Sequence, residues 1–547
     1  MTDIGSASAG ALDNQPPPYG DVDLFGSDPA LMAAVRTFGA AEAVHDLAAF
    51  GRRWGRADLF AAAETANERI PQLITGADGR RDVVAFDESY HRFMRESIAD
   101  GLQASTWSAA GARAPAPAEM ARAARFYMVA QVENGHMCPI TMTRAAVAAL
   151  QAQPDLLTQL MPQIASRHYD PRFLPWGEKH GMTLGMGMTE RQGGTDVRSN
   201  TSRALSDGDH YRITGHKWFM SAPMCDAFLV LAQADGGLTC FFMPRFRPDG
   251  TVNRLMFRKL KDKLGNRSNA SSEVDFEDAY ALRVGDEGRG IRTILSMVQL
   301  TRLDCAISSA GLMRAALARA LHHTRHRIVF QKHLADQPMM TTVLADLALT
   351  SEAAMALALR LARAFDHAAT DEGEAAYARL MTPAVKYWIC KTAPGFVYEA
   401  MECLGGNGYV ADSAMPRLYR EAPVNAIWEG SGNVMALDVL RVLRDGAQAR
   451  AVLDALRRVT TGLPGADAAC DDLLSAAQDP ALERHARDLV ERLAVLAAAA
   501  ALAEMGSPAA VSFAESRLAR SRGSLFGAMT LSEGSARDVL ARAVSER

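Results

Sequence analysis

The chain has 547 residues, of which 48% are hydrophobic and 22% are charged. This length is too great for a single core and predicts three or four domains, and the composition is typical of an ordinary soluble globular protein. The formal net charge of -4 at pH 7 excludes a general electrostatic attraction to nucleic acid or to an anionic membrane.

The cysteines and the apolar runs indicate the compartment. Seven cysteines are scattered from Cys138 to Cys470 with no Cys-x-x-Cys pair, so we expect buried thiols in a reducing cytosol and no metal site. The N-terminal residues MTDIGSASAG lack a basic stretch followed by an apolar one, which predicts no secretory signal. The longest apolar run, Leu493 to Leu502, is half the length needed to cross a bilayer. We therefore expect a cytoplasmic protein without a membrane span.

The first part of the chain changes from a proline-rich segment to helical patterns. Residues 1–20 contain three consecutive prolines, Pro16 to Pro18, and predict a mobile N-terminal tail or an arm along the surface. Ser27, Asp28 and Pro29 then form a good helix start, because proline at the first helical position loses no hydrogen bond. Alanine-rich helical stretches follow, so we expect a helical domain over residues 21–180.

Between residues 181 and 290 the sequence pattern changes to one typical of short strands. His210 to Ile213 alternates, while Phe228 to Leu231 and Thr239 to Met243 are apolar runs of strand length. Clusters of glycine and aspartate separate these runs. Such spacing predicts a small β-barrel or sandwich, which we place as a β-barrel domain at 181–290.

Helical patterns return from Gly290. A stripe of apolar positions between residues 340 and 365 predicts one long packed helix, and a helical bundle domain is expected over 291–445. An alanine- and arginine-rich C-terminal helical extension fills 446–547. The fold class expected is mainly α with a central β domain.

A single acidic residue stands out in the helical part. Glu429 lies between a bulky aromatic residue, Trp428, and the Gly430-Ser431-Gly432 turn. An acid held against an apolar ring resists ionisation, so its pKa rises toward neutrality and it can act as a general base. Glycines beside it allow a planar ligand to approach closely. The pattern alone nevertheless favours a helix-capping turn with an incidental exposed glutamate.

The residues around Glu429 are similar to a known family motif. Trp428 to Ser431 resembles the Tyr-Glu-Gly-Thr segment of the acyl-CoA dehydrogenases, in which the glutamate removes the α-proton of an acyl thioester. The surrounding run resembles the branch of that superfamily linked to the response to DNA alkylation. The resemblance implies a helical domain, a β-barrel and a four-helix bundle, followed here by the C-terminal extension. It also implies FAD as the cofactor and Glu429 as the catalytic base.

Two further motifs carry the resemblance in the β domain. Residues Met186 to Thr195 resemble the family motif Met-Thr-Glu-x-x-x-Gly-(Ser/Thr)-Asp, although a glycine-rich string alone is weak evidence. Residues 215–221 form an aromatic strand pattern that alone favours core packing. In the family the equivalent segment reads Lys-x-Trp-Ile-Thr, and Phe219 and Ser221 take the places of its tryptophan and threonine. Ser221 keeps the hydroxyl.

Two segments of the helical bundle complete the resemblance. Thr301 stands where some relatives carry their catalytic glutamate, and Arg302 matches the family arginine beneath the active site. Arg327 to Phe330 resembles the Arg-x-x-Phe-Gly segment that reaches the FAD of a neighbouring subunit, with Gln331 in place of glycine. Residues Gly405 to Gly408 resemble the turn that takes the FAD pyrophosphate, although a plain helix-to-helix turn fits the pattern too.

The site expected from the resemblance has four groups of residues. The catalytic residues are Glu429 and Arg302. The FAD-binding residues are Met186, Gly187, Met188, Thr189, Gly194, Thr195, Phe219, Met220, Ser221, Arg327, Phe330, Gly405, Gly406, Asn407, Gly408, Ile427, Trp428, Gly430, Ser431, Gly432 and Asn433. The substrate-binding residues are Thr189, Thr195, Ser221 and Asn433. The resemblance further implies a homotetramer, an acyl-CoA substrate, and electron-transfer flavoprotein or oxygen as the electron acceptor.

A function of another class stays open. The alternative is a flavin-containing protein that binds double-stranded DNA and protects it, with vestigial dehydrogenase activity. Its contacts would be Arg441, Arg517, Arg520 and Arg522. Because residues 446–547 carry a net charge of only about -1, any such footprint would be local, and arginines before Gly523 also favour a helix C-terminus.

Overall fold

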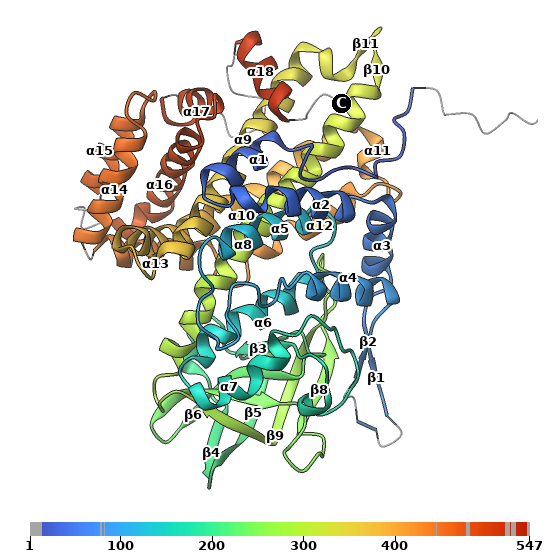
Figure 1. Ribbon diagram of the computed structural model, residues 1–547, viewed down its shortest axis with the longest axis vertical. Helices are drawn as coiled ribbons and strands as arrows, with labels where there is room; N and C mark the ends of the chain where they lie inside the picture. Colours follow the sequence, from blue (N-terminus) through green and yellow to red (C-terminus); the bar gives the residue numbers. More distant parts are fainter. Residues whose placement is uncertain are drawn as a thin grey trace, which may run out of the picture.

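The computed structural model describes residues 14–76, 79–80, 83–444, 446–476, 482–519, 526 and 532–543. A large helical part stands on a smaller β part, and the C-terminal helices pack along one side of the helical part (Figure 1). The order helical, β, helical agrees with the fold class predicted from the sequence.

The N-terminal domain is helical apart from one hairpin. Its helices are α1 (Pro29–Thr37), α2 (Val44–Trp54), α3 (Ala57–Glu68), α4 (Glu88–Ala99), α5 (Ala118–Ala130), α6 (Met137–Leu150) and α7 (Pro154–Ile164). The first helix begins as predicted, because Asp28 Oδ1 accepts a 3.1 Å hydrogen bond from the Leu31 amide. The sequence reasoning missed the short hairpin of β1 (Gln72–Ile74) and β2 (Val83–Ala85).

The β domain closes on itself. Its strands are β3 (Leu184–Thr189), β4 (Arg203–Asp207), β5 (His210–Ser221), β6 (Ala227–Ala234), β7 (Gly237–Pro244), β8 (Leu255–Leu260) and β9 (Ser271–Val284). The sheet order is β3-β5-β4-β6-β7-β9-β8, with additional pairings of β3 with β6 and of β5 with β9. Strands β5, β9, β7, β6 and β4 therefore form a ring of paired strands, which is the expected barrel.

Long helices form the bundle above the barrel. They are α8 (Gly290–His326), α9 (Pro338–His367), α10 (Glu372–Glu402) and α13 (Gly432–Leu443), with short helices α11 (Gly406–Tyr409) and α12 (Met415–Glu421) between the last two. Helix α9 is long and apolar enough to cross a membrane, but 83% of its apolar window is buried inside the protein. It is the packed core helix that the apolar stripe predicted.

The C-terminal helices join the main core. They are α14 (Ala447–Val459), α15 (Ala466–Ala476), α16 (Leu482–Glu504), α17 (Ala509–Ala514) and α18 (Glu533–Ala543). The apolar run Leu493–Leu502 is buried within α16, where it packs against α9, α10 and α13. Arg314 ties both ends of the chain to this core, because it pairs with Asp28 at 3.2 Å and donates to the Ala543 carbonyl at 2.6 Å.

The first described residues, from Asn14 onward, are anchored to the helical part. Asn14 exchanges two hydrogen bonds with the backbone of Ile328, at 2.6 and 2.8 Å, and the Pro17 carbonyl lies 2.8 Å from His322 Nε2. Residues 14–20 therefore lie along the helical part, which agrees with the predicted arm along the surface and not with a mobile tail. Residues 1–13 lie outside the described residues.

The cysteines behave as expected. All seven are free and buried. Within the described residues, no group of three or more His, Cys, Asp or Glu side chains could hold a metal ion.

Candidate active site

The turn before α13 places the carboxyl group of Glu429. The backbone of Glu429 is left-handed, with φ of 58°, and that of Gly430 has φ of 102°. A non-glycine residue in this region costs roughly 1 kcal/mol or more, so the surrounding contacts must hold it there. The side chain is only partly accessible and faces a cavity. The simple alternative, an exposed glutamate in a capping turn, is therefore wrong.

Burial and hydrogen bonding shift the pKa of the Glu429 carboxyl group in opposite directions. Burial raises the pKa of Glu429 above its ordinary value. The Thr301 hydroxyl donates a 2.7 Å hydrogen bond to Glu429 Oε2, and the charges of Lys386 and Arg302 also favour the carboxylate. A partly buried carboxylate with a raised pKa and one fixed oxygen has the properties of a general base.

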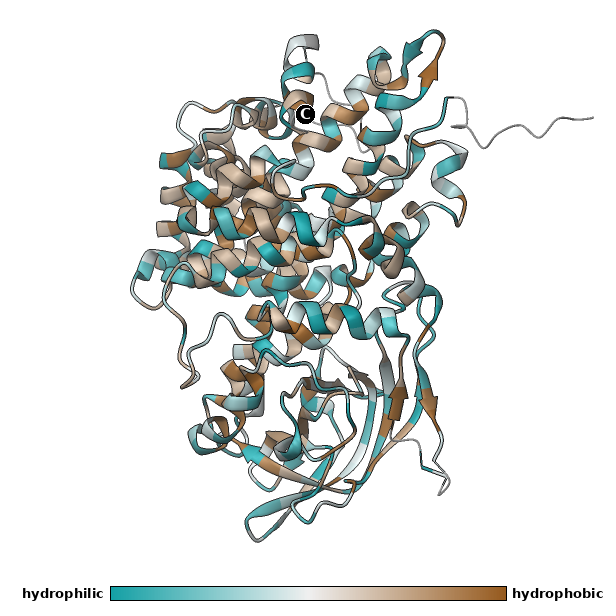
Figure 2. Cartoon of the chain, turned by 45° about the vertical axis from the view of Figure 1, so that its right-hand side comes forward, coloured by the Kyte–Doolittle hydropathy of each residue, from teal (hydrophilic) through white to brown (hydrophobic). Residues whose placement is uncertain are grey.

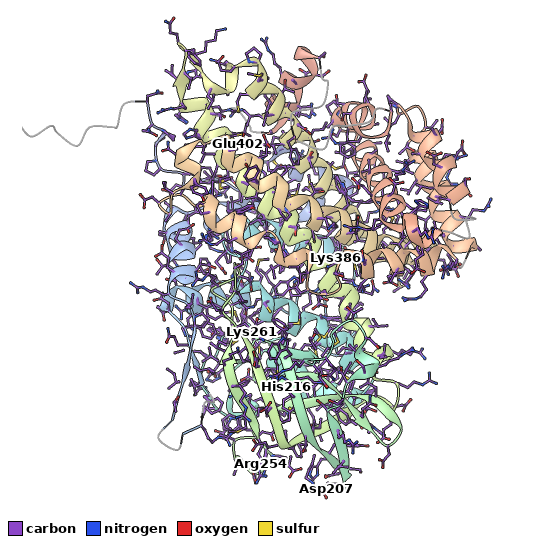
Figure 3. The ribbon with its side chains drawn as sticks, turned by 180° about the vertical axis from the view of Figure 1, so that it is seen from behind. Asp207, His216, Arg254, Lys261, Lys386 and Glu402 are labelled. Atoms are coloured by element: carbon purple, nitrogen blue, oxygen red, sulfur yellow. The ribbon has the colours of Figure 1, made fainter. Side chains whose placement is uncertain are left out.

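The cations near Glu429 hold its backbone. Arg302 Nε donates to the Glu429 carbonyl at 3.1 Å, while its Nη1 pairs with Asp438 at 2.7 Å. Lys386 Nζ donates to the Gly430 carbonyl at 2.7 Å. Arg302, predicted as catalytic, thus makes the contacts of a positioning residue. Lys386 on α10 belongs to the helical part and Lys261 to the β domain, on either side of the boundary between them (Figure 3).

The two predicted cofactor segments of the β domain lie side by side. Strands β3 and β5 are antiparallel neighbours, in which Met186 is opposite Ser221 and Thr189 is opposite Phe219. The register shifts between these pairs, so the strands are irregular at this point. Phe219 is 49% exposed, although it is a large apolar residue. Met220 is buried in the barrel core, so only its backbone is available to a ligand.

One charged pair beneath these strands was not identified from the sequence. Lys217 Nζ lies 2.7 Å from Glu190 Oε1, and both side chains are buried. Burial alone would raise the pKa of Glu190, but the Lys217 ammonium lowers it to about 2. Glu190 also accepts from the Thr201 amide at 2.7 Å. The glutamate of the Met-Thr-Glu motif therefore fastens the loop that follows β3.

The other predicted cofactor residues lie at the far end of α8. Arg327 follows the last residue of α8, whereas Arg302 lies near its beginning, so about 38 Å of helix separates them. Arg327 Nη1 donates to the Asn14 carbonyl at 2.8 Å, and Asn407 donates to Gln15 at 3.0 Å. The predicted groups at 327–330 and 405–408 thus share the N-terminal segment and are remote from Glu429 in one chain.

The hairpin that follows α8 presents apolar side chains to solvent. Strands β10 (Ile328–Val329) and β11 (Lys332–His333) are joined by Phe330 and Gln331, with φ of 50° and 66°. Gln331 replaces the family glycine and keeps its left-handed backbone. Phe330 is 89% exposed, and hydrophobic residues mark the tip of this hairpin (Figure 2).

A cavity adjoins Glu429. Its empty volume is ≈ 410 Å³, part of which is continuous with solvent. Thr301, Trp428 and Glu429 line one part of it, and residues of α5, α6, α8, α12 and the loops between these elements line the rest. Trp428 is half-buried, and its Nε1 donates to Asn425 Oδ1 at 2.8 Å. The cavity joins the candidate base to the interior of the helical part.

The proposed DNA contacts do not form one patch in the described part of the chain. The Arg517 side chain is 6% exposed and pairs with the buried Asp346. It therefore supports the core, and its prediction as a phosphate contact is wrong. Arg441 is 71% exposed and lies 2.9 Å from Asp438. Arg520 and Arg522 lie outside the described residues.

Three family models match the chain. The adaptive response protein AidB N-terminal domain matches residues 14–171. The acyl-CoA dehydrogenase middle domain matches residues 185–279, and the C-terminal domain of the same family matches residues 288–444. These ranges follow the N-terminal helical domain, the barrel and the helical bundle.

Individual relatives agree with the family models. AidB of Escherichia coli (strain K12), which carries the name of an acyl-CoA dehydrogenase, is 47% identical over 90% of this chain and 92% of its own length. Caenorhabditis elegans ACDH-11, solved in complex with C11-CoA, has a TM-score of 0.84 at 25% identity, covering 98% of this chain and 96% of that one. A Bacillus anthracis acyl-CoA dehydrogenase complexed with FAD shares the fold, with a TM-score of 0.67 at 16% identity, covering 94% and 87%. The chain therefore belongs to the acyl-CoA dehydrogenase family and is close to AidB.

Proposed function

We propose that the protein is an FAD-dependent oxidoreductase that introduces a double bond between the α and β carbons of an acyl-CoA thioester. The observation that carries this proposal is Glu429, a partly buried carboxylate with a raised pKa that borders a cavity. A general base must have a pKa near the working pH and must reach the proton it removes. Burial shifts the pKa of Glu429 in the direction that the first condition requires, and the cavity beside it is where an acyl group would bind.

The residues around Glu429 have separate roles in this reaction. Glu429 takes the α-proton, and the Thr301 hydroxyl holds one carboxylate oxygen in place. Arg302 and Lys386 fix the backbone carbonyls of Glu429 and Gly430, which keeps the left-handed turn in one conformation. Bound FAD supplies the acceptor for the β-hydrogen and its electron pair. Trp428 and the helices that line the cavity shield part of it from solvent.

The residues at the domain boundary fit the flat ring system of FAD. Phe219 is about half exposed and Ile427 is 67% exposed, which leaves apolar side chains without cover in the chain itself. Gly194 has no room for a side chain, because an added Cβ would lie 2.8 Å from Thr189 Oγ1. The exposed residues Thr195, Ser431 and Asn433 add polar groups. The relative from Bacillus anthracis named as complexed with FAD supports the same assignment.

The separation of the predicted FAD residues supports an oligomer. About 38 Å of α8 lies between Arg302, which contacts the Glu429 carbonyl, and Arg327, so the segment at Arg327 is remote from the candidate base within one chain. The residues near Thr189 and the segments at Arg327 and Gly405 can contact the same FAD only if the two sets come from neighbouring chains. We therefore propose a homotetramer built as a dimer of dimers, with Phe330 in an interface.

Dehydrogenation is favoured over DNA binding. Among the predicted DNA contacts that the structure describes, Arg441 is exposed and Arg517 is occupied by Asp346. The net charge of -4 provides no general attraction to phosphate. Electron-transfer flavoprotein and oxygen are the acceptors consistent with the proposal.

Anaerobic titration of the purified protein tests this function. The protein should contain about one FAD per chain, and at least one member of a panel of acyl-CoA thioesters should bleach the flavin absorbance. A protein that stays colourless when FAD is added, or a flavin that no thioester reduces, would contradict the proposal.

A further inference from the structure

The cavity follows one face of helix α8. Thr301, Asp304, Cys305 and Ser308 all line it, and their spacing places them on one side of the helix. With a rise of about 1.5 Å per residue, Ser308 lies roughly 10 Å further along the helix than Thr301. Because Thr301 contacts the base, Ser308 marks a position in the cavity remote from the reacting carbons.

The wall between these two positions is mainly apolar. On α6, Met137, Cys138 and Met142 line the cavity, and on α8 Cys305 does so. Burial raises the pKa of the Cys138 thiol to about 11, so the thiol stays neutral near pH 7. Thioether and neutral thiol groups pack well against methylene groups. This stretch suits the saturated part of an acyl chain.

The inner position has a cluster of buried polar side chains. Ser308 Oγ donates to Asn134 Oδ1 at 2.5 Å, and Asn425 Nδ2 donates to Ser309 Oγ at 3.1 Å and lies 3.4 Å from Ser308 Oγ. The Asn425 oxygen accepts from Trp428. Ser308, Asn134 and Asn425 line the cavity, whereas Ser309 does not. The cluster therefore borders the space that an acyl chain would occupy.

The unused hydrogen-bonding capacity of this cluster is mostly that of acceptors. A hydroxyl oxygen and an amide oxygen each have two lone pairs. The Ser308 proton is already donated to Asn134, and both hydrogens of the Asn425 amide face the two serines. The oxygens of Ser308, Asn134 and Asn425 each retain room for another donor. A ligand group that matches them must donate.

We propose, on the basis of the function proposed above, that this site takes acyl-CoA thioesters whose chain of about six carbons ends in a neutral hydrogen-bond donor, such as a hydroxyl or a primary amide. Bonds of about 1.5 Å allow such a chain to extend from Glu429 to hydrogen-bonding distance of Ser308. A plain alkyl end would displace water from polar groups and give no hydrogen bond in return.

A terminal carboxylate suits the site less well. Asp304 and Glu421 also line the cavity, and burial raises the pKa of Glu421. Arg122 and Arg144 form ion pairs with Asp304 at 2.7 and 3.0 Å. A second anion near Asp304 would be repelled by its carboxylate, and the two arginines there are already paired.

Binding of matched thioesters tests the inference. Dissociation constants of 6-hydroxyhexanoyl-CoA, hexanoyl-CoA and adipoyl-CoA are measured by calorimetry with the FAD-loaded Glu429→Gln variant, which prevents turnover. We expect the hydroxylated thioester to bind about tenfold more tightly than hexanoyl-CoA, as one net hydrogen bond in a buried site predicts. Adipoyl-CoA should bind more weakly than the hydroxylated thioester.

A pair of adjacent serines provides the control. Ser308→Ala should remove most of the preference for 6-hydroxyhexanoyl-CoA, whereas Ser309→Ala, next to it and also bonded to Asn425, should keep it. Equal binding of the first two thioesters by the unaltered cavity overturns the inference, even if Ser308→Ala fails to fold. If hexanoyl-CoA also bleaches the wild-type flavin in that case, the proposed dehydrogenation stands. If no thioester binds or bleaches the flavin, both proposals fail.

Discussion

The Thr301 hydroxyl donates a 2.7 Å hydrogen bond to Glu429 Oε2, which joins the beginning of α8 to the turn before α13. The Thr301 hydroxyl also lies 2.9 Å from the Val298 carbonyl, so two acceptors share its single proton. Its hydroxyl therefore has a fixed position. We infer that Thr301 sets both the direction and the proton affinity of the candidate base.

The pH dependence of flavin reduction should report this bond. Glu429 acts as the carboxylate, so the rate should rise with pH through a pKa above the ordinary value near 4.3. Thr301→Val removes a hydrogen bond to the charged form, which raises the pKa and moves the midpoint to higher pH. Thr301→Ser retains the hydroxyl and should shift the midpoint less. Identical midpoints in wild type and Thr301→Val, measured by stopped-flow bleaching, would contradict this role.

The Lys217–Glu190 pair should be important for stability. Lys217→Met leaves the Glu190 carboxylate buried without its cation, which should lower the free energy of unfolding by about 3–5 kcal/mol. Because the pKa of Glu190 is lowered from 4.5 to about 2, this stabilisation is present above pH 4.5 and is lost as pH falls toward 2. Urea unfolding measures the change. Lys259→Met is the control and should cost under about 1 kcal/mol, because Lys259 is exposed and its partner Glu273 keeps its ion pair with Lys261.

Substitution of Arg517 should affect stability rather than DNA binding. Asp346 is fully buried, so Arg517→Ala removes a buried ion pair and should cost about 3–5 kcal/mol. Arg441→Ala, at an exposed side chain, should change the free energy of unfolding by less than about 1 kcal/mol. Arg517→Ala that unfolds like wild type but loses affinity for duplex DNA would restore the phosphate contact that the structure argues against.

Assembly and FAD binding should fail together when the hairpin is altered. Phe330→Asp places a charge on the exposed tip between β10 and β11, so the tetramer should dissociate and the FAD content should fall. Light scattering and flavin absorbance measure the two effects. Val511→Asp, at an exposed apolar side chain of α17, is the control and should alter neither. A Phe330→Asp protein that remains tetrameric with full FAD would contradict the shared site.

The fold was predictable because its signals are periodic. The stripe of apolar residues between 340 and 365 predicted α9, and the short apolar runs in 181–290 predicted strands of the barrel. The hairpin of β1 and β2 was missed, because strands of three residues provide too few positions for alternation to be recognised. The contacts that anchor residues 14–20 were missed, since they depend on Ile328 and His322, which are remote in the sequence.

The site was predictable in its residues but only partly in its arrangement. Motif resemblance indicated Glu429, but the contact of Thr301 with it depends on the packing of α8 against the turn before α13. Arg302 was expected in the chemistry, whereas its position under a backbone carbonyl gives it a supporting role. Arg517 looked like a surface charge from composition alone. Its partner Asp346 lies on another helix, and no local pattern indicates that pairing.

The most direct test of the account is anaerobic flavin reduction by an acyl-CoA in the Glu429→Gln variant. Glutamine fills the same space but cannot take the α-proton, so FAD should stay bound while bleaching slows by at least about two to four orders of magnitude. Thermal unfolding and the FAD content should remain close to those of the wild type. Bleaching at the wild-type rate in Glu429→Gln would show that another group is the base and would contradict the account.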